Sequence, residues 1–216
     1  MIWTVSGNPA GAQSIEHRFE VGAQFAAPTF GEFSETDVGL GGRLSYRLTS
    51  LIGVEGELNV FPAKLTGEGD YVSGHGGNHF SGHFSGYRAE GLFGVTIGPR
   101  LEKFGLFGRL RPGFVRFGET PGPFVCISAI LGTTGPPVIY PQPLECSLAE
   151  GHTVFALDFG GGIELFATER TTFRLDVGDR VLRYPGPVLS PDGETDLDGA
   201  FWSHNFRVAV AGAFRF

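Results

Sequence analysis

Apolar and polar side chains alternate along eight stretches of the chain, which is the pattern of β-strands with two different faces. In the last stretch, NFRVAVAGAFRF (205–216), every second position is apolar until Gly212, and the chain ends in phenylalanine. The seven earlier stretches cover residues 17–27, 38–48, 52–60, 85–97, 104–117, 153–166 and 172–184. Pro112 predicts a bulge or irregularity in the fifth of them. The pattern predicts an all-β chain of eight strands.

The connections between these strands alternate between long and short. The long ones run over about 28–37, 62–83, 118–152 and 185–203, and the short ones over 49–50, 98–103 and 167–171. In an antiparallel up-and-down arrangement, four long loops then lie at one end, with the short turns and both termini at the other. An even strand number with this loop asymmetry is typical of a transmembrane β-barrel. No run of 18 apolar residues exists, so a transmembrane helix is not expected.

The polar face decides between two barrels that share this alternation. A soluble lipocalin-like barrel has its apolar face inside, whereas a membrane barrel has it outside. Here the polar face carries Arg, Asp, Glu and Gly but almost no Lys, which suits a crowded interior of paired charges better than a solvated surface. The residues expected in this interior charge network are Arg18, Glu20, Arg43, Arg47, Glu55, Glu57, Arg88, Glu90, Arg109, Arg111, Asp158, Glu164, Arg174, Asp176, Arg180 and Arg207. Eight strands enclose a space that side chains can fill, so we expect a polar, side-chain-filled interior without an open pore.

Aromatic residues flank the predicted apolar face at both ends, as the two girdles of a membrane barrel do. We expect one girdle at the long-loop ends, formed by Phe25, Tyr87, Phe155, Tyr184 and Trp202. The other, at the short-turn ends, is expected to contain Tyr46, Phe104, Phe166, Phe214 and Phe216.

Length and composition bound the remaining choices. At 216 residues with 35 Gly, 21 Phe and 18% charged residues, the chain fits one β-barrel domain, expected over 17–216. Residues 1–16 are expected to be an N-terminal arm or a leader remnant. A net charge of −7 and the lack of a basic cluster argue against nucleic acid as a partner.

Three segments carry the resemblance to a known family: GLFGVTIGPRLEKFGLFGRLRPGFVRFG (91–118), GGGIELFATERTTFRLDVGDRVLRY (160–184) and FRVAVAGAFRF (206–216). They resemble the outer-membrane β-barrel domain proteins of Gram-negative bacteria, the OmpA/OmpX-type eight-stranded barrels. The resemblance implies a location in the outer membrane, with outer-membrane lipid as surroundings. It also implies that Val208, Val210, Phe214 and Phe216 form the signal read by the barrel-assembly machinery.

Other residues suggest individual sites in the long loops. Cys126 and Cys146 are expected to form a disulfide in an oxidising compartment. Weak metal candidates are His75, His79 and His83, spaced by four, and the acidic group Asp192, Glu194, Asp196 and Asp198, which partly imitates a calcium loop. Neither group has a complete ligand set, so no metal, cofactor or catalytic residue is predicted.

The function expected from these patterns is a small, non-catalytic outer-membrane barrel with a structural or surface-interaction role. One alternative is a self-assembling extracellular barrel whose apolar belt is covered by neighbouring subunits, because such a belt needs a cover. Another is a lipid-modifying enzyme that uses a His-x-Ser pair, His79-Phe80-Ser81 or His83-Phe84-Ser85.

Overall fold

The structure is a computed structural model of the 216-residue chain. It describes residues 17–30, 35–62, 65–71, 78–84, 87–119, 148, 151–185, 188–189, 195–197 and 200–216. Within these residues no helix is long and apolar enough to cross a membrane.

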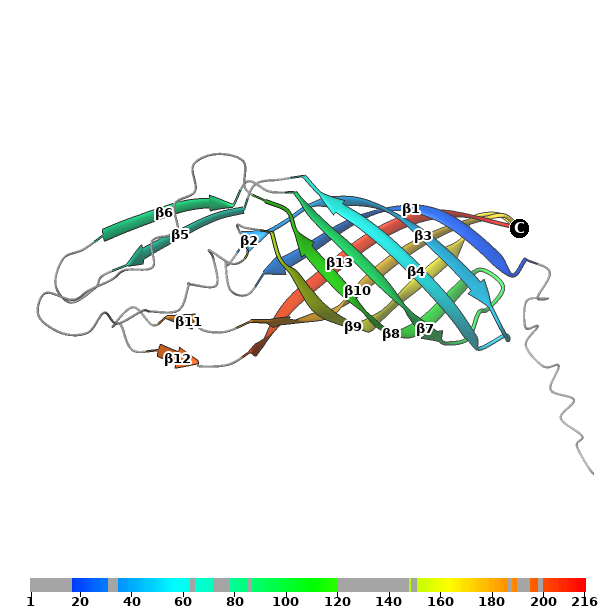
Figure 1. The fold of residues 1–216 in the computed structure, drawn as a ribbon. Helices are drawn as coiled ribbons and strands as arrows, with labels where there is room; N and C mark the ends of the chain where they lie inside the picture. The colour runs from blue at the N-terminus through cyan, green and yellow to red at the C-terminus, as the bar shows by residue number, and fades with distance from the viewer. Residues whose placement is uncertain are drawn as a thin grey trace, which may run out of the picture.

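Eight antiparallel strands form a closed barrel (Figure 1). In chain order they are β1 (Phe19–Phe30), β3 (Gly39–Arg47), β4 (Ile52–Phe61), β7 (Arg88–Ile97), β8 (Phe104–Phe117), β9 (Thr153–Phe166), β10 (Thr171–Tyr184) and β13 (Phe201–Arg215). Each pairs with its neighbour in sequence, and β13 pairs with β1 from Glu20↔Arg215 to Pro28↔Arg207. The predicted eight-stranded up-and-down barrel is confirmed, and its closure leaves neither terminal strand with an unpaired edge.

The two faces of the barrel are reversed relative to a soluble protein. Along β8, buried and exposed residues alternate strictly from Phe104 to Pro112, and the buried positions include Arg109 and Arg111. Most exposed positions of the barrel strands are apolar, with Phe93 64% and Leu58 68% exposed. Period-two alternation thus places charged side chains in the lumen and large apolar side chains on the outer surface.

Short strands that the alternation did not predict lie in the long connections. β2 (Glu35–Thr36) pairs with the end of β1, β5 (Leu65–Tyr71) pairs with β6 (Asn78–Phe84), and β11 (Val188–Leu189) pairs with β12 (Thr195–Leu197). In Figure 1 the β5–β6 hairpin and the β11–β12 pair extend beyond the end of the barrel opposite the C-terminus. The long connections therefore lie at one end, as predicted.

Pro112 coincides with an interruption in the pairing of β7 with β8. The register runs from Arg88↔Phe117 to Leu92↔Gly113 and resumes at Val95↔Leu110, with no pairs for the two residues between Leu92 and Val95. The two residue numbers of a pair add up to the same value on both sides of the gap, so the register does not shift. The irregularity predicted at Pro112 is a local loss of pairing, because proline has no N–H to donate, rather than a bulge.

Candidate functional site: the charged lumen

Arg111 on β8 occupies the middle of the lumen and binds three carboxylates. Its Nη1 lies 2.9 Å from Glu55 Oε1 and 2.5 Å from Glu57 Oε2, both on β4, and its Nη2 lies 2.7 Å from Asp158 Oδ2 on β9. All four side chains are fully excluded from solvent. Because β7 separates β8 from β4 in the sheet, the bonds from Arg111 to β4 pass through the interior.

Arg174 and Glu55 connect opposite walls of the barrel. Three strands lie between β10 and β4 in either direction around the barrel. Nevertheless Arg174 Nη1 lies 2.7 Å from Glu55 Oε2, and its Nη2 donates to Glu55 Oε1 at 3.2 Å. Such a forked pair is the strongest geometry that guanidinium and carboxylate can adopt. The pair therefore joins β10 to β4 through the interior of the barrel.

The aromatic ring of Phe107 packs against the Arg174 guanidinium group. The Arg174 guanidinium carbon lies 3.8 Å from the centroid of the Phe107 ring, a cation–π contact. Phe107 pairs with Gly162 on β9, and a Cβ added at Gly162 would lie 2.7 Å from the Phe107 ring and 2.2 Å from the Leu175 carbonyl oxygen. Glycine at 162 therefore leaves the space that the Phe107 ring occupies.

Asp176 and Asp158 join further arginines to this central layer. Arg109 lies 2.7 Å from Asp158 and 2.8 Å from Asp176, and Arg43 on β3 reaches Asp176 at 3.3 Å. The central layer consequently alternates cations and anions around the whole lumen, so each buried charge has an opposite charge beside it.

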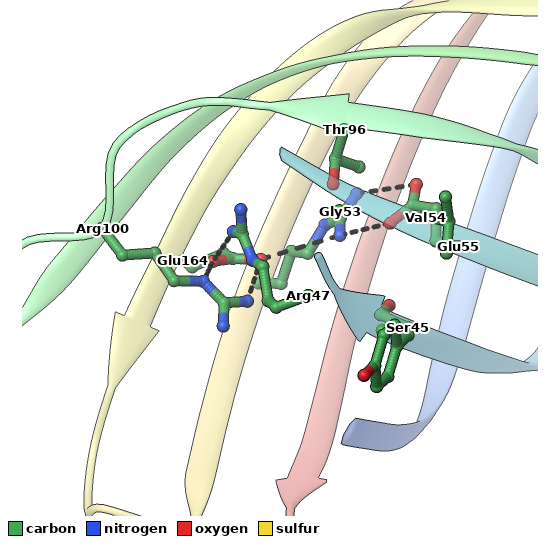
Figure 2. Close-up of a pocket in the computed structure, with 10 residues that line it drawn as sticks. Ser45, Arg47, Gly53, Val54, Glu55, Thr96, Arg100 and Glu164 are labelled. Atoms are coloured by element: carbon green, nitrogen blue, oxygen red, sulfur yellow. Dashed lines mark hydrogen bonds and ion pairs between the residues drawn. The ribbon is translucent and has the colours of Figure 1, made fainter. Parts of the chain in front are cut away.

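Arg100, in the turn between β7 and β8, forms ion pairs at the short-turn end of the barrel (Figure 2). Its Nη1 is 2.5 Å from Glu20, its Nε is 2.6 Å from Glu164, and Arg47 also reaches Glu164 at 3.4 Å. Burial lowers the pKa of the Arg100 guanidinium, but the charges of Glu164 and Glu20 outweigh that effect and raise the pKa above its ordinary value. Arg100 is therefore a permanent cation at this mouth.

A cavity of about 10 Å³ lies beside these ion pairs, lined by Ser45, Arg47, Glu55, Thr96, Arg100 and Glu164 among others (Figure 2). This volume is about that of one water molecule. It is much smaller than the several hundred Å³ of a typical small-molecule site. The cavity therefore has no room for an organic ligand.

Toward the long loops the charged pairs continue. Arg180 lies 2.6 Å from Glu90, and Arg207 contacts both Glu57 and Glu90. Gln24 and Asn59 add amide groups, with Gln24 Nε2 donating to Asn59 Oδ1 at 2.8 Å. Asn59 Nδ2 also donates to Glu57 Oε1 and Glu90 Oε1, the same two oxygens that Arg207 contacts, so the amide adds a neutral donor to these ion pairs.

Asp37 and Arg88 pair nearest the long loops. Asp37 precedes β3, and its Oδ2 lies 2.5 Å from Arg88 Nη2. Burial raises the pKa of the Asp37 carboxyl above its ordinary value, although the charge of Arg88 opposes the rise. The pair carries the charge network up to the end of the barrel.

The long-loop mouth itself is apolar. Its buried cluster contains Leu92, Val115, Phe117, Leu148, Val154, Ala156, Leu182 and Tyr184, with Phe201 packed against it. All except Leu148 come from barrel strands, whereas Leu148 comes from the connection between β8 and β9 and is only 1% exposed. At this end the apolar cluster lies beside the Asp37–Arg88 pair, since Arg88 is the register partner of Phe117.

The predicted network residues fall almost entirely in the lumen. Every one of them is buried except Arg18, which precedes β1 and is exposed, so its assignment to the interior was wrong. Arg18 lies one residue before β1; its carbonyl oxygen still accepts a hydrogen bond from Arg47 N at 2.8 Å, but its side chain is exposed to solvent at this end of the barrel. Residues that the prediction missed are Gln24, Asp37, Asn59, Arg100 and Arg215, all buried except the partly exposed Arg100.

Two aromatic residues do not lie where the girdle prediction placed them. Tyr184 is fully buried inside the long-loop mouth, stacked on Phe201 with ring centroids 5.5 Å apart. Phe166 shares the inward face of β9 with Glu164, and the Arg100 and Arg215 guanidinium carbons lie 5.4 and 4.8 Å from its centroid. The remaining girdle residues are exposed on the outer surface.

The C-terminal residues of the predicted assembly signal lie on the outer face of β13. Val210, Phe214 and Phe216 are exposed and Val208 is partly exposed, while Ala209, Ala211 and Ala213 face the lumen. The last residue is hydrogen-bonded to the first residue of β1, with Phe216 N donating to Phe19 O at 2.8 Å. Their role as an assembly signal stays a prediction.

Several predicted sites lie outside the described residues. These are Cys126, Cys146, His75, Asp192, Glu194 and Asp198, together with the side chains of His79, His83 and Asp196. Across the residues that are described, no group of three or more metal-binding side chains occurs. Among the described histidines, His204 contacts a carboxylate: its Nδ1 lies 2.5 Å from Asp179 Oδ2 on the outer surface.

The inverted, closed barrel is the architecture of an outer-membrane protein. A family model described as "Outer membrane protein beta-barrel domain" matches residues 3–214, and the chain belongs to this family. No curated protein sequence matches.

Solved structures of similar chains include three outer-membrane or surface barrels. Neisserial surface protein A is 9% identical with a TM-score of 0.45, covering 92% of this chain and 96% of its own. OprG from Pseudomonas aeruginosa is 12% identical (TM-score 0.46; 93% and 96% covered). Ail, the attachment invasion locus protein of Yersinia pestis, is 13% identical (0.41; 92% and 97%). These similarities carry no information on activity.

Proposed function

We propose that the protein is a sealed, non-catalytic barrel of the Gram-negative outer membrane, with a structural role and with long connections that contact partners outside the cell. The observation that carries this proposal is the Arg174–Glu55 pair across the full width of the lumen. Arg100 closes one mouth beside it, and the apolar cluster around Leu148 fills the other. A lumen filled in three successive layers does not conduct solutes.

The outer surface supports a place in lipid. Large apolar side chains cover the outward positions of all eight barrel strands, as in Phe25, Leu58, Phe93, Leu106, Phe159, Leu175 and Val210. An exposed apolar surface of this size must be covered by lipid or by other protein to be shielded from water. A closed barrel satisfies its backbone groups internally, which the hydrocarbon interior of a bilayer demands.

The composition of the long connections supports an outward-facing role. Residues 31–38, 62–87, 118–152 and 185–200 together contain twelve Asp and Glu but a single lysine, Lys64. Acidic, polar segments of this length are costly to bury in lipid and are typical of solvated surface loops. A basic partner is the kind that this charge favours.

Reconstitution into planar lipid bilayers tests the sealed lumen. Insertion is first established by resistance of the barrel to unfolding in SDS without heating. We expect no steady conductance from the inserted protein, while a pore-forming peptide added afterwards confirms that the bilayer reports current. A stable ohmic conductance of the wild-type protein would contradict the proposal.

Dependence on detergent tests the membrane location separately. We expect the refolded protein to precipitate when detergent is removed without lipid. A monodisperse particle in plain buffer would exclude the membrane location, and ordered polymers would favour the self-assembling extracellular barrel.

A further inference from the structure

Arg116 and Arg183 are the strand arginines of the described barrel whose side chains lie on its outer face. The other arginines within barrel strands are buried inside. Arg116 is the second-last residue of β8 and Arg183 the second-last of β10, so both stand where the strands enter long connections. An outward charge at this border is costly in hydrocarbon and favourable at the level of lipid headgroups.

The barrel register brings the two arginines onto one patch. Arg116 pairs with Thr153 on β9, Phe155 on β9 pairs with Arg183, and Arg183 pairs with Trp202 on β13. With ordinary strand spacing and rise, the two arginine backbones lie about 12 Å apart, within reach of two extended arginine side chains. We call Arg116, Thr153, Phe155, Arg183 and Trp202 the outer patch.

Aromatic rings fix the position of Arg183 within the outer patch. Phe155 and Trp202 lie on the strands on either side of β10, yet their ring centroids are 6.1 Å apart with an interplanar angle of 87°. The Arg183 guanidinium carbon lies 5.9 Å from the Trp202 centroid. Two rings therefore meet across the strand that carries Arg183 and support its side chain, which remains exposed.

Neither arginine of the outer patch forms an ion pair with a carboxylate of the described chain, although Glu119 lies near Arg116, since Glu119 Cγ and Arg116 Nη2 are 3.1 and 3.3 Å from the position of a Cβ added at Gly151. Arg116 Nη1 donates to the Thr153 hydroxyl at 3.2 Å, and no Asp or Glu of the described residues lies within 4.0 Å of either guanidinium. This contrasts with Arg111 and Arg174 in the lumen, each of which contacts at least two carboxylates. The exposed donors of the outer patch are thus available to an external anion.

We infer that the outer patch binds the phosphate of a lipid headgroup in the leaflet next to the long connections. Guanidinium groups bind phosphate through forked hydrogen bonds, and the patch opens sideways toward lipid rather than into the lumen. Apart from Asp37, which is buried and paired with Arg88, the carboxylates of the adjoining connections repel dissolved anions, whereas a phosphate held in the bilayer is already beside the patch. This inference rests on the proposed location of the barrel in a membrane.

Quenching of Trp202 fluorescence by brominated lipid tests the inference. Trp3 and Trp202 are the two tryptophans of the chain, so a Trp3→Phe background reports Trp202 alone. The barrel is reconstituted in phosphatidylcholine vesicles that contain a minor fraction of either brominated phosphatidate or brominated phosphatidylcholine. Two nearby arginines should give roughly a tenfold preference for phosphatidate at Trp202.

Variants identify the residues responsible. The double variant Arg116→Gln/Arg183→Gln should lower the preference to about that of phosphatidylcholine, whereas Arg170→Gln, which removes an exposed charge in the β9–β10 turn at the other end, should leave it unchanged. Arg116→Lys/Arg183→Lys keeps both charges but loses the forked geometry, so an intermediate preference is expected.

Several outcomes would overturn the inference. They are equal quenching by both lipids, a preference that survives the Gln double variant, an equal loss in Arg170→Gln, or displacement of phosphatidate by an excess of inorganic phosphate, which would indicate a site for dissolved anions. A wild-type barrel that no brominated lipid quenches would instead refute insertion in the bilayer, and with it the proposed function.

Discussion

Arg111 contacts three buried carboxylates, and replacing it leaves all three without this cation. We expect Arg111→Met to lower the free energy of unfolding by about 3–5 kcal/mol, because Glu55, Glu57 and Asp158 remain buried after their shared cation is removed. Urea unfolding of the barrel in lipid vesicles, followed by tryptophan fluorescence, measures the change.

Arg43→Met is the matched control for this prediction. Arg43 is equally buried but has one carboxylate contact, at 3.3 Å with Asp176, which keeps Arg109 and Arg174 as partners. Its loss of stability should be less than half that of Arg111→Met. Equal losses would show that the lumen responds to volume rather than to charge.

Gly162 makes room for Phe107, and a methyl group there removes that room. Gly162→Ala should destabilise the barrel by about 1–3 kcal/mol, because the Leu175 carbonyl and the Phe107 ring must both move. Gly212→Ala on the outer face of β13 is the control, since its added Cβ would lie 3.9 Å from the nearest atom of the Phe173 ring, an ordinary van der Waals contact. Unfolding of both variants in the same vesicles compares them, and an equal effect would refute the steric explanation.

Side-chain direction was predictable from the sequence wherever a residue lies in a paired strand. The alternation assigned the buried charges from Glu20 to Arg207 to the correct face because a strand inverts its side chains at every residue. It failed at Arg18, which precedes β1 at the end of the barrel and is exposed, and it had no information on Arg100, which lies in a turn. The position of Arg100 over the mouth depends on how that turn folds back, and neighbouring sequence does not encode this.

Two of the short turns share one hydrogen-bond pattern. Thr49 Oγ1 accepts hydrogen bonds from the backbone N–H groups of Leu51 and Ile52, and Thr168 Oγ1 does so from Arg170 and Thr171, at 2.9 to 3.2 Å. In each turn the threonine hydroxyl takes the place of a backbone acceptor. The β3–β4 and β9–β10 hairpins are therefore closed by the same device.

Thr168→Ala should destabilise the β9–β10 hairpin by about 1 kcal/mol, because two backbone donors lose their acceptor and turn to water instead. Thr168→Ser retains the hydroxyl and should be close to wild type. Hydrogen exchange at the amides of Arg170 and Thr171 is the direct measurement, and unchanged exchange in Thr168→Ala would contradict this account of the turn.

Most barrel strands were predicted to within a few residues, because their apolar and polar positions alternate over long stretches. β8 and β9 have the predicted bounds of 104–117 and 153–166. β13 begins earlier than predicted, at Phe201, because His204 interrupts the outward apolar pattern between Trp202 and Phe206. The β5–β6 hairpin escaped prediction for the same reason, since its Gly-rich and polar sequence has no apolar face.

Leu148 links the longest connection to the barrel. We expect Leu148→Ala to lower the free energy of unfolding by about 2–4 kcal/mol, because it leaves a cavity among Val115, Leu182 and Tyr184 in the long-loop mouth. Leu101→Ala, in an exposed turn position at the other end, should cost far less. Urea unfolding in vesicles separates the two, and equal stabilities would mean that Leu148 does not anchor the connection.

The sequence by itself determined the strand number, the up-and-down order, the alternation of loop lengths and the reversal of the two faces, because each follows from period two along single strands. Only the tertiary structure decided which charges meet, such as Arg174 with Glu55 across the lumen and Arg116 near Arg183 on the outside. Those contacts depend on strand register and barrel closure, which join residues far apart in the chain. Local alternation gives the face of a side chain, and register gives its partner.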